Sequence, residues 1–214
     1  MPSIVSIIGI QNSGKTTLVE KLVAELTVRG HRVATMKHAS HGTSFDEPGK
    51  DSWRHIQAGS LATLVSSPDQ VLLFGPPPGD TGPQELAQYL GEDYDIILAE
   101  GFKWGKGAKI EVHRKENGPP LSDIENLVAI ATDEPLDGDV LKLDLADVKG
   151  IVDFIEKEFI SGSRDGLSLY INDKSVPLKE FPRGIITNLL LGVAASLSRV
   201  GKVKNMKLFL RKKG

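Results

Sequence analysis

The amino-acid sequence predicts an α/β fold in which a mostly parallel sheet is flanked by helices. Short β-branched, apolar runs such as 3–10 (SIVSIIGI) and 95–99 (DIILA) are typical of strands buried on both faces of a parallel sheet. Between residues 3 and 160 these runs alternate with segments of helical periodicity, which favours βαβ units. The length of 214 residues allows one large domain and a small appendix.

The first strand, 3–10, runs into a glycine loop and then into a helix at 17–29. This helix carries Leu18, Leu22 and Leu26 at helical spacing, and Gly30 stands at the position of a C-cap glycine. A helix at 83–89 begins with Pro83, which suits the first helical position. The remaining elements expected in this part are strands at 32–36, 61–66, 71–74, 95–99, 110–113, 127–131 and 140–143, and helices at 51–57 and 146–159.

A linker at 161–166 (SGSRDG) separates a nucleotide-binding domain, 1–160, from an appendix, 167–214. The appendix is predicted as ββαβ: a hairpin of 167–171 with 176–178, a helix at 182–197 and a strand at 207–210. Its basic tail is interpreted as the solvated edge of a packing or dimerisation module, with partner or nucleotide binding as the alternative. The basic residues of this tail are Arg199, Lys202, Lys204, Lys207, Arg211, Lys212 and Lys213.

Composition excludes several classes of function. A net charge of −2 gives no global field that would attract nucleic acid or an anionic membrane. The count of 0 cysteines excludes disulfides, thiolate metal sites and cysteine nucleophiles. Apolar runs stay below the roughly 18 residues of a membrane span, and residue 1 leads straight into a strand without a signal-peptide pattern. We therefore expect a soluble, cytoplasmic protein that binds neither nucleic acid nor membrane.

The segment from Gly9 to Thr16 (GIQNSGKT) matches the phosphate-loop pattern G-x-x-x-x-G-K-[ST], between a strand and a helix. Its glycines let backbone N–H groups point at phosphate oxygens, and the following helix presents its positive end to the same charge. Lys15 can reach the β- and γ-phosphates, and the Thr16 hydroxyl can coordinate Mg²⁺. Gln11 is a candidate for orienting a water. The motif narrows the fold prediction to a P-loop NTPase.

Glu100 directly follows the strand 95–99, so it is expected at the sheet edge where ligands bind, as the metal-side carboxylate. Asp46 and Asp51, in the long polar stretch 37–51, are rival or additional Mg²⁺ partners.

Further polar residues surround this predicted edge. His38 and His41 fit metal binding, anion or partner contact, or plain solvation. The basic residues can receive a second phosphorylated ligand or serve as surface charge, and Trp53 and Trp104 can stack on a ring or anchor their loops. The candidate contacts to a second ligand or partner are Lys37, His38, His41, Lys50, Asp51, Arg54 and Lys103, with Lys106 and Lys109 as further basic loop residues.

Several segments together resemble the MobB family, the molybdopterin-guanine dinucleotide biosynthesis protein B family. They are GIQNSGKTTL, MKHASH, FDEPGKDSWRHIQAG, ILAEGFK and VAIATDEP, in this order between residues 3 and 160. The resemblance implies a GTP- and Mg²⁺-binding protein with weak GTPase activity. The phosphate-loop motif itself makes Lys15 and Gln11 the candidate catalytic residues. It also implies an adapter that assists a MobA-type molybdopterin guanylyltransferase in joining GMP to molybdopterin, with delivery of the cofactor to a molybdoenzyme as a further role.

The same resemblance assigns roles to individual residues. Thr16, Asp46 and Glu100 would lie around Mg²⁺, while Thr132 and Asp133 would meet the guanine base. The phosphates would be held by Gly9, Gln11, Asn12, Ser13, Gly14, Lys15, Thr16 and Thr17. The chain departs from the family pattern in two ways: it has Gly42 where family members often carry an acid, and it adds the appendix. The usual N-K-x-D guanine motif is also absent.

Two other functions stay open at this stage. A small-molecule kinase or ligase would also use a phosphate loop, and a nucleotide-dependent metal-insertion chaperone would use His38 and His41. A homodimer is expected, with the apolar segment 185–193 as interface or core.

Overall fold

The structure is a computed structural model that describes residues 2–39, 46–76, 82–160, 167, 169–171, 174–176, 178–197, 202–203, 206 and 208. Its internal contacts divide the chain into two units, Met1–Arg164 and Asp165–Gly214. The predicted linker 161–166 and most of the predicted strand 207–210 lie outside the described residues.

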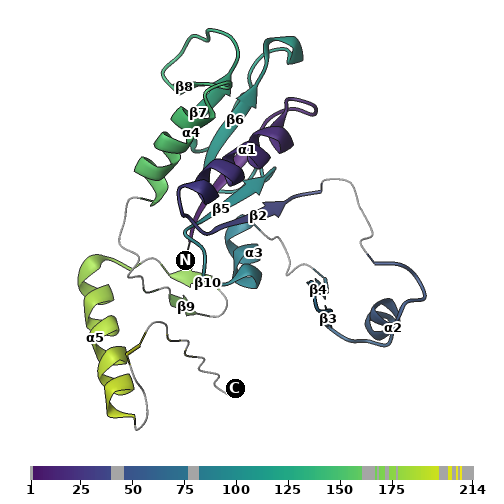
Figure 1. The fold of residues 1–214 in the computed structure, drawn as a ribbon, viewed down its shortest axis with the longest axis vertical. Coiled ribbons are helices and arrows are strands. Elements are labelled where there is room, and N and C mark those ends of the chain that lie inside the picture. The colour runs from purple at the N-terminus through teal and green to yellow at the C-terminus, as the bar shows by residue number, and fades with distance from the viewer. Residues whose placement is uncertain are drawn as a thin grey trace. The chain divides into compact units, whose positions relative to one another are not determined.

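The first unit is built on a six-stranded sheet in which every pair of neighbours is parallel (Figure 1). The strand order is β2-β5-β1-β6-β7-β8, so β1 lies inside the sheet with β5 on one side and β6 on the other. This arrangement confirms the predicted fold class. The strands are β1 (Ser3–Ile8), β2 (Val33–Lys37), β5 (Ile96–Glu100), β6 (Ala108–His113), β7 (Leu127–Thr132) and β8 (Leu141–Asp144).

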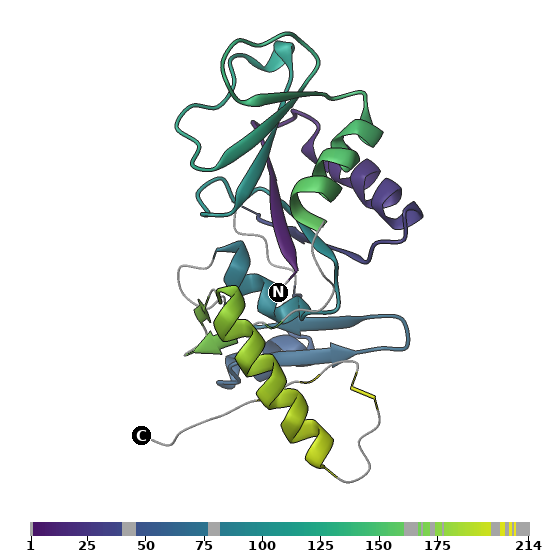
Figure 2. The ribbon, with the colours of Figure 1, turned by 90° about the vertical axis from the view of Figure 1, so that its left-hand side faces the viewer.

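Helices cover both faces of this sheet. Figure 2 shows α1 (Lys15–Val28) and α4 (Val148–Ile155) side by side, and their apolar residues share one core cluster with the strands. The helix α3 (Pro83–Leu90) packs against the other face through Ala87. Side chains of β5 alternate between the two clusters, as a strand buried on both faces requires.

The helix ends follow capping rules with small shifts from the predicted bounds. Gly30, at φ 89°, donates its N–H to the Thr27 carbonyl over 2.9 Å, and His31 donates to Leu26 over 3.1 Å. This is a Schellman end, so the predicted C-cap glycine is confirmed. The last predicted helix of this unit begins at Val148, capped by Asp147, and continues as a π-helical segment (Glu156–Ile160).

Between β2 and α3 the chain forms α2 (Asp51–Gln57), β3 (Thr63–Ser66) and β4 (Val71–Phe74). The bounds of α2 and β4 match the predictions, and β3 begins two residues later than predicted. The strands β3 and β4 pair antiparallel in a sheet of their own. The reason lies in the connection 67–70, which is long enough for a hairpin turn and too short for the crossover that parallel strands need. The turn is closed by the Ser67 N–H, which donates to the Gln70 carbonyl over 2.9 Å.

The second unit contains the antiparallel pair β9 (Leu169–Ile171) and β10 (Lys174–Val176), followed by α5 (Glu180–Ser196). The predicted hairpin and helix are present, although β10 begins earlier than predicted, so the connection is only 172–173. Apolar side chains such as Phe181, Ile185 and Leu189 are exposed on α5. In the described ranges, no helix has both the length and the apolarity needed to cross a bilayer.

One side of β6 is polar although it is buried. Lys109, Glu111 and His113 alternate with the core residues Ile110 and Val112 and are almost without solvent exposure. The Glu111 Oε1 atom accepts the Leu121 N–H over 2.9 Å, while Oε2 has no hydrogen-bond partner among the described residues. Burial raises the pKa of Glu111, and the Leu121 N–H and the neighbouring His113 and Lys103 oppose this rise.

We predict that Glu111→Gln stabilises the protein at neutral and alkaline pH. Because the raised pKa applies to the folded state, wild-type stability falls as pH rises from about 4.5, the unfolded value, through the folded pKa. Below that window both proteins are neutral at this position and should unfold alike. Thermal unfolding from pH 4 to 8 measures this, and a difference between the two proteins that does not change with pH contradicts it.

Candidate functional site

The phosphate loop leaves the carboxyl end of β1 through a close backbone approach. Gly9, at φ 150°, passes so near β6 that a Cβ there would lie 2.6 Å from the Val112 carbonyl oxygen and 2.7 Å from Ser13 Oγ. Gly14, at φ 92°, is the N-cap of α1 in the left-handed region. Both glycines are therefore required by geometry, and the first helical turn of α1 directs its N–H groups towards the loop.

Inside the loop, polar groups fold back on the backbone. Lys15 Nζ donates to the Ile10 carbonyl over 2.5 Å, and the Ser13 N–H donates to the same carbonyl over 3.4 Å. Burial lowers the pKa of Lys15, with Glu100 opposing this shift and Lys103 and Lys37 adding to it. Gln11, Asn12, Thr16 and Thr17 are exposed, while Ser13 is buried. A half-buried lysine surrounded by cations favours an anionic ligand.

Glu100 ends β5 beside the phosphate loop. The Thr16 hydroxyl donates to Glu100 Oε1 over 2.8 Å, and Lys37 Nζ lies 3.0 Å from the same oxygen. The parallel register of β2 with β5 pairs Lys37 with Glu100 directly. The structure thus brings together Thr16, Glu100 and Lys37, three of the residues singled out in the sequence.

The other predicted metal-side acids belong to the segment around α2. Ser52 Oγ donates to Asp46 Oδ1 over 2.9 Å, which holds Asp46 against the first turn of this helix. Asp51 lies 3.5 Å from Arg54, and Lys50 lies 2.8 Å from Glu47. These polar groups are engaged within their own segment, whose neighbours 40–45 and 77–81 are outside the described residues.

The histidine pair is described only in part, because His41 lies outside the described residues. His38 continues from β2, donates its N–H to the Glu100 carbonyl over 2.9 Å and tilts its ring against Phe102 at 5.2 Å between centroids. Within the part of the chain that the structure describes, no three His, Asp or Glu side chains gather as a metal ion would require.

The assignment of Lys109 to a loop near the ligand was wrong. Lys109 belongs to β6 and is fully buried, and its ammonium donates to the carbonyls of Glu125 over 2.6 Å, Gly107 over 3.1 Å and Gly105. Three carbonyl partners satisfy this charge, so Lys109 holds the loop after β5 onto the sheet. Lys103 lies in that loop close enough to affect Lys15, whereas Trp104 is 88% exposed.

Asp133 follows β7 and is held by two donors from the segment after β6. Arg114 Nη1 lies 2.9 Å from Asp133 Oδ2, and the Lys115 N–H donates to Oδ1 over 3.1 Å, at the start of a 3₁₀ turn (Lys115–Asn117). The Lys115 N–H is the main cause of the lowered pKa of Asp133, and Arg114 adds to it. Arg114 was not among the residues predicted from the sequence, although it meets the criterion that selected Glu100, a charged residue directly after a buried strand.

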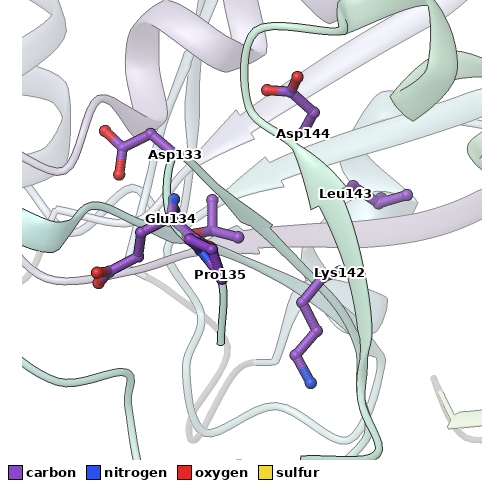
Figure 3. Close-up of a pocket in the computed structure, with 7 residues that line it drawn as sticks. Asp133, Glu134, Pro135, Lys142, Leu143 and Asp144 are labelled. Atoms are coloured by element: carbon purple, nitrogen blue, oxygen red, sulfur yellow. Dashed lines mark hydrogen bonds between the residues drawn. The ribbon is translucent and has the colours of Figure 1, made fainter. Parts of the chain in front are cut away.

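An open cavity of about 300 Å³ adjoins Asp133 at the ends of β7 and β8. Figure 3 shows Asp133, Glu134 and Pro135 on one side of it and Lys142, Leu143 and Asp144 on the other. Thr132 also lines the cavity, and its hydroxyl closes the turn by accepting the Glu134 N–H over 3.1 Å. A volume at the lower end of small-molecule sites suits one ring system.

Comparison with known proteins identifies similar chains. The model of the family described as "Molybdopterin guanine dinucleotide synthesis protein B" (MobB) matches residues 4–133. A protein of Haemophilus influenzae named molybdopterin-guanine dinucleotide biosynthesis adapter protein is 39% identical over 72% of this chain and 87% of its own. Its namesake in Escherichia coli is 38% identical over 67% and 85% of the two chains. The crystal structure of a MobB homologue from Bacillus stearothermophilus superposes with a TM-score of 0.55 at 28% identity, covering 73% of this chain and 97% of that one.

We predict that Gly9→Ala abolishes binding of magnesium–nucleotide, because the added methyl group would push the loop away from Val112. Gly30→Ala is the matched control: Gly30 also has positive φ, but nothing lies within 4 Å of its Cβ position. The control should lose about 1 kcal/mol of stability and bind nucleotide normally. Calorimetric titration and thermal unfolding of both variants measure this. Equal affinities would show that the close approach at Gly9 is unimportant.

Proposed function

This chain belongs to the MobB family, and on that premise we propose that it is a GTP-binding adapter in the biosynthesis of molybdopterin guanine dinucleotide. It would assist the guanylyltransferase that attaches GMP to molybdopterin. The observation that carries the nucleotide part of this proposal is the contact between the Thr16 hydroxyl and Glu100, 2.8 Å apart beside the phosphate loop.

These two groups fit a magnesium ion. Mg²⁺ prefers oxygen ligands in an octahedron at about 2.1 Å, which places neighbouring ligands about 3.0 Å apart. The Thr16 hydroxyl donates its proton to Glu100 and so keeps its lone pairs available for a metal. A magnesium ion bound there would neutralise phosphate charge. Asp46 is proposed as a further ligand of this ion. Lys15, beside them, would hold the β- and γ-phosphates.

We propose only weak GTP hydrolysis. Phosphoryl transfer depends on positioning and on cancelling the charge that develops on the phosphoryl oxygens. Lys15 can supply part of that charge, and Gln11 is exposed at the tip of the loop, where it can orient a water. The Arg114 guanidinium, by contrast, is engaged by Asp133 and by the backbone of Ser13. A slow site of this kind suits a protein that acts through a partner.

The proposed partners are a MobA-type guanylyltransferase, molybdopterin or a molybdoenzyme, and a second copy of the chain. Exposed apolar side chains support association: Leu64, Leu72 and Leu73 on the β3–β4 hairpin are each exposed by 45% or more, as are Phe181 and Leu189 on α5. A cytoplasmic location is proposed with these partners. Sedimentation analysis of the wild type against Leu64→Ser/Leu73→Ser tests dimer formation through the hairpin.

The adapter function is tested by adding the protein to a guanylyltransferase, molybdopterin and Mg²⁺–GTP, and measuring formation of the dinucleotide cofactor. We expect a higher rate or yield with the wild type, together with co-sedimentation of the two proteins. A protein that leaves both quantities unchanged is not an adapter for that enzyme. If it phosphorylates a small-molecule acceptor instead, the kinase alternative is correct.

We predict that Lys15→Ala weakens binding of Mg²⁺–GTP at least about 100-fold, because charge-assisted contacts to phosphate are lost. Lys21→Ala, which removes an exposed lysine from the same helix, is the control and should bind like the wild type. Calorimetric titration measures both, and thermal unfolding verifies that the variants are folded. Undiminished affinity of Lys15→Ala would refute the assignment of the phosphate loop.

A further inference from the structure

A nucleotide has a limited span, so a site that reads its base needs a carboxylate held at a set distance from the phosphate loop. Here Asp133 and the phosphate loop come from different segments, after β7 and after β1. The sequence lacks the N-K-x-D motif, so no side chain of that motif can connect them. Another group has to fix this distance if the base is to be read.

Arg114 contacts both the phosphate loop and Asp133 with one guanidinium group. Its Nε donates to the Ser13 carbonyl over 3.2 Å, and its Nη1 donates to Asp133 Oδ2 over 2.9 Å. The same group passes the phosphate loop at close range: Nε and Nη2 both lie 3.6 Å from the Cβ position of Gly14. A planar guanidinium with donors in fixed directions is suited to joining two acceptors at a defined separation.

The segment that carries Arg114 is itself fixed. It follows β6 directly, and the Asn117 N–H donates to the Arg114 carbonyl over 2.9 Å. The Lys115 N–H donates to the other oxygen of Asp133. Arg114 and Lys115 therefore each hydrogen-bond one oxygen of this carboxylate. The side chains of Arg114 and Asp133 remain 37% and 39% exposed, which leaves them accessible to a ligand.

We propose that Arg114 is a positioning residue that sets guanine selectivity by locking the carboxylate of Asp133 to the phosphate loop. The inference rests on the proposed function. Each carboxylate oxygen has two lone pairs, so Asp133 can keep its contacts to Arg114 and Lys115 while it accepts the N1–H and the 2-amino group of guanine. Adenine offers no such pair of donors, and a carboxylate that moved freely relative to the phosphates would discriminate poorly.

The test compares affinities of wild type and variants for Mg²⁺–GTP, Mg²⁺–ATP and Mg²⁺–tripolyphosphate by calorimetric titration. For Arg114→Ala we expect the preference for GTP over ATP to fall at least about tenfold, as loss of a charged hydrogen bond implies. Affinity for tripolyphosphate, which has no base, should change by less than about threefold. Arg114→Lys should not restore the preference, because an ammonium lacks the planar fork.

Three further variants complete the design. Arg32→Ala removes an arginine that also faces a carboxylate, with its guanidinium 3.7 Å from Asp95, but that is more exposed than Arg114, at 62% against 37%. Arg32 lies just before β2, at the opposite strand end from the phosphate loop, so this variant should behave as wild type. Asp133→Asn exchanges an acceptor for a donor and should shift preference towards xanthosine triphosphate, which carries an oxygen in place of the 2-amino group. Adding Arg114→Ala to Asp133→Asn should cause little further loss, since the two residues act as one unit.

Each remaining outcome is decisive. If Asp133→Asn loses the preference for GTP and Arg114→Ala keeps it, the inference is wrong while the proposed function stands. If Arg114→Ala weakens tripolyphosphate as strongly as GTP, Arg114 only supports the phosphate loop and the inference is wrong again. If the wild type itself binds ATP as tightly as GTP, guanine reading fails and the inference fails with it.

Discussion

Ile7 of β1 pairs in register with Glu100 of β5 on one side and with Ile110 of β6 on the other. This parallel register brings the carboxyl ends of the inner strands to one edge of the sheet, so the loop that leaves β1 begins level with Glu100. The same rule continues outward, where Thr132 of β7 pairs with Asp144 of β8. A slip of one residue would turn every side chain to the opposite face and separate Glu100 from Thr16.

The charged groups around Lys15 favour binding of a polyanion. Lys15 is partly buried, and Lys37 and Lys103 both disfavour its protonated form, while Glu100 is the main group that favours it. Around Lys15, two further lysines thus oppose a single carboxylate. The β1 loop adds the helix N-terminus of α1 to the same region. The arrangement is therefore suited to a phosphate group rather than to self-contained packing.

Sequence alone predicted the parts of this structure that depend on local rules. Gly9, Gly14 and Gly30 were identified because a close approach or a positive φ admits few other residues, and the buried strands were visible from their composition. Contacts between segments that are distant in the sequence were harder to predict. The hairpin of β3 with β4 was predicted as two strands but not as a separate sheet, and Lys109 was placed in a loop because burial of a lysine by three carbonyls has no sequence signature. The contact of Arg114 with Ser13 joins residues 101 positions apart.

Glu100 and Asp133, two of the acids at this edge, are held in different ways, and the difference matches their proposed partners. Glu100 contacts a hydroxyl and the point charge of Lys37, two groups that constrain the position of an oxygen more than the orientation of a plane. A hard cation such as Mg²⁺ needs no more than that, since its ligands are single oxygens. Asp133 is instead fixed through both oxygens, one by the Nη1 group of Arg114 and the other by the backbone N–H of Lys115. Recognition of a flat base by two parallel hydrogen bonds requires an oriented carboxylate, and only the second acid is oriented in this way.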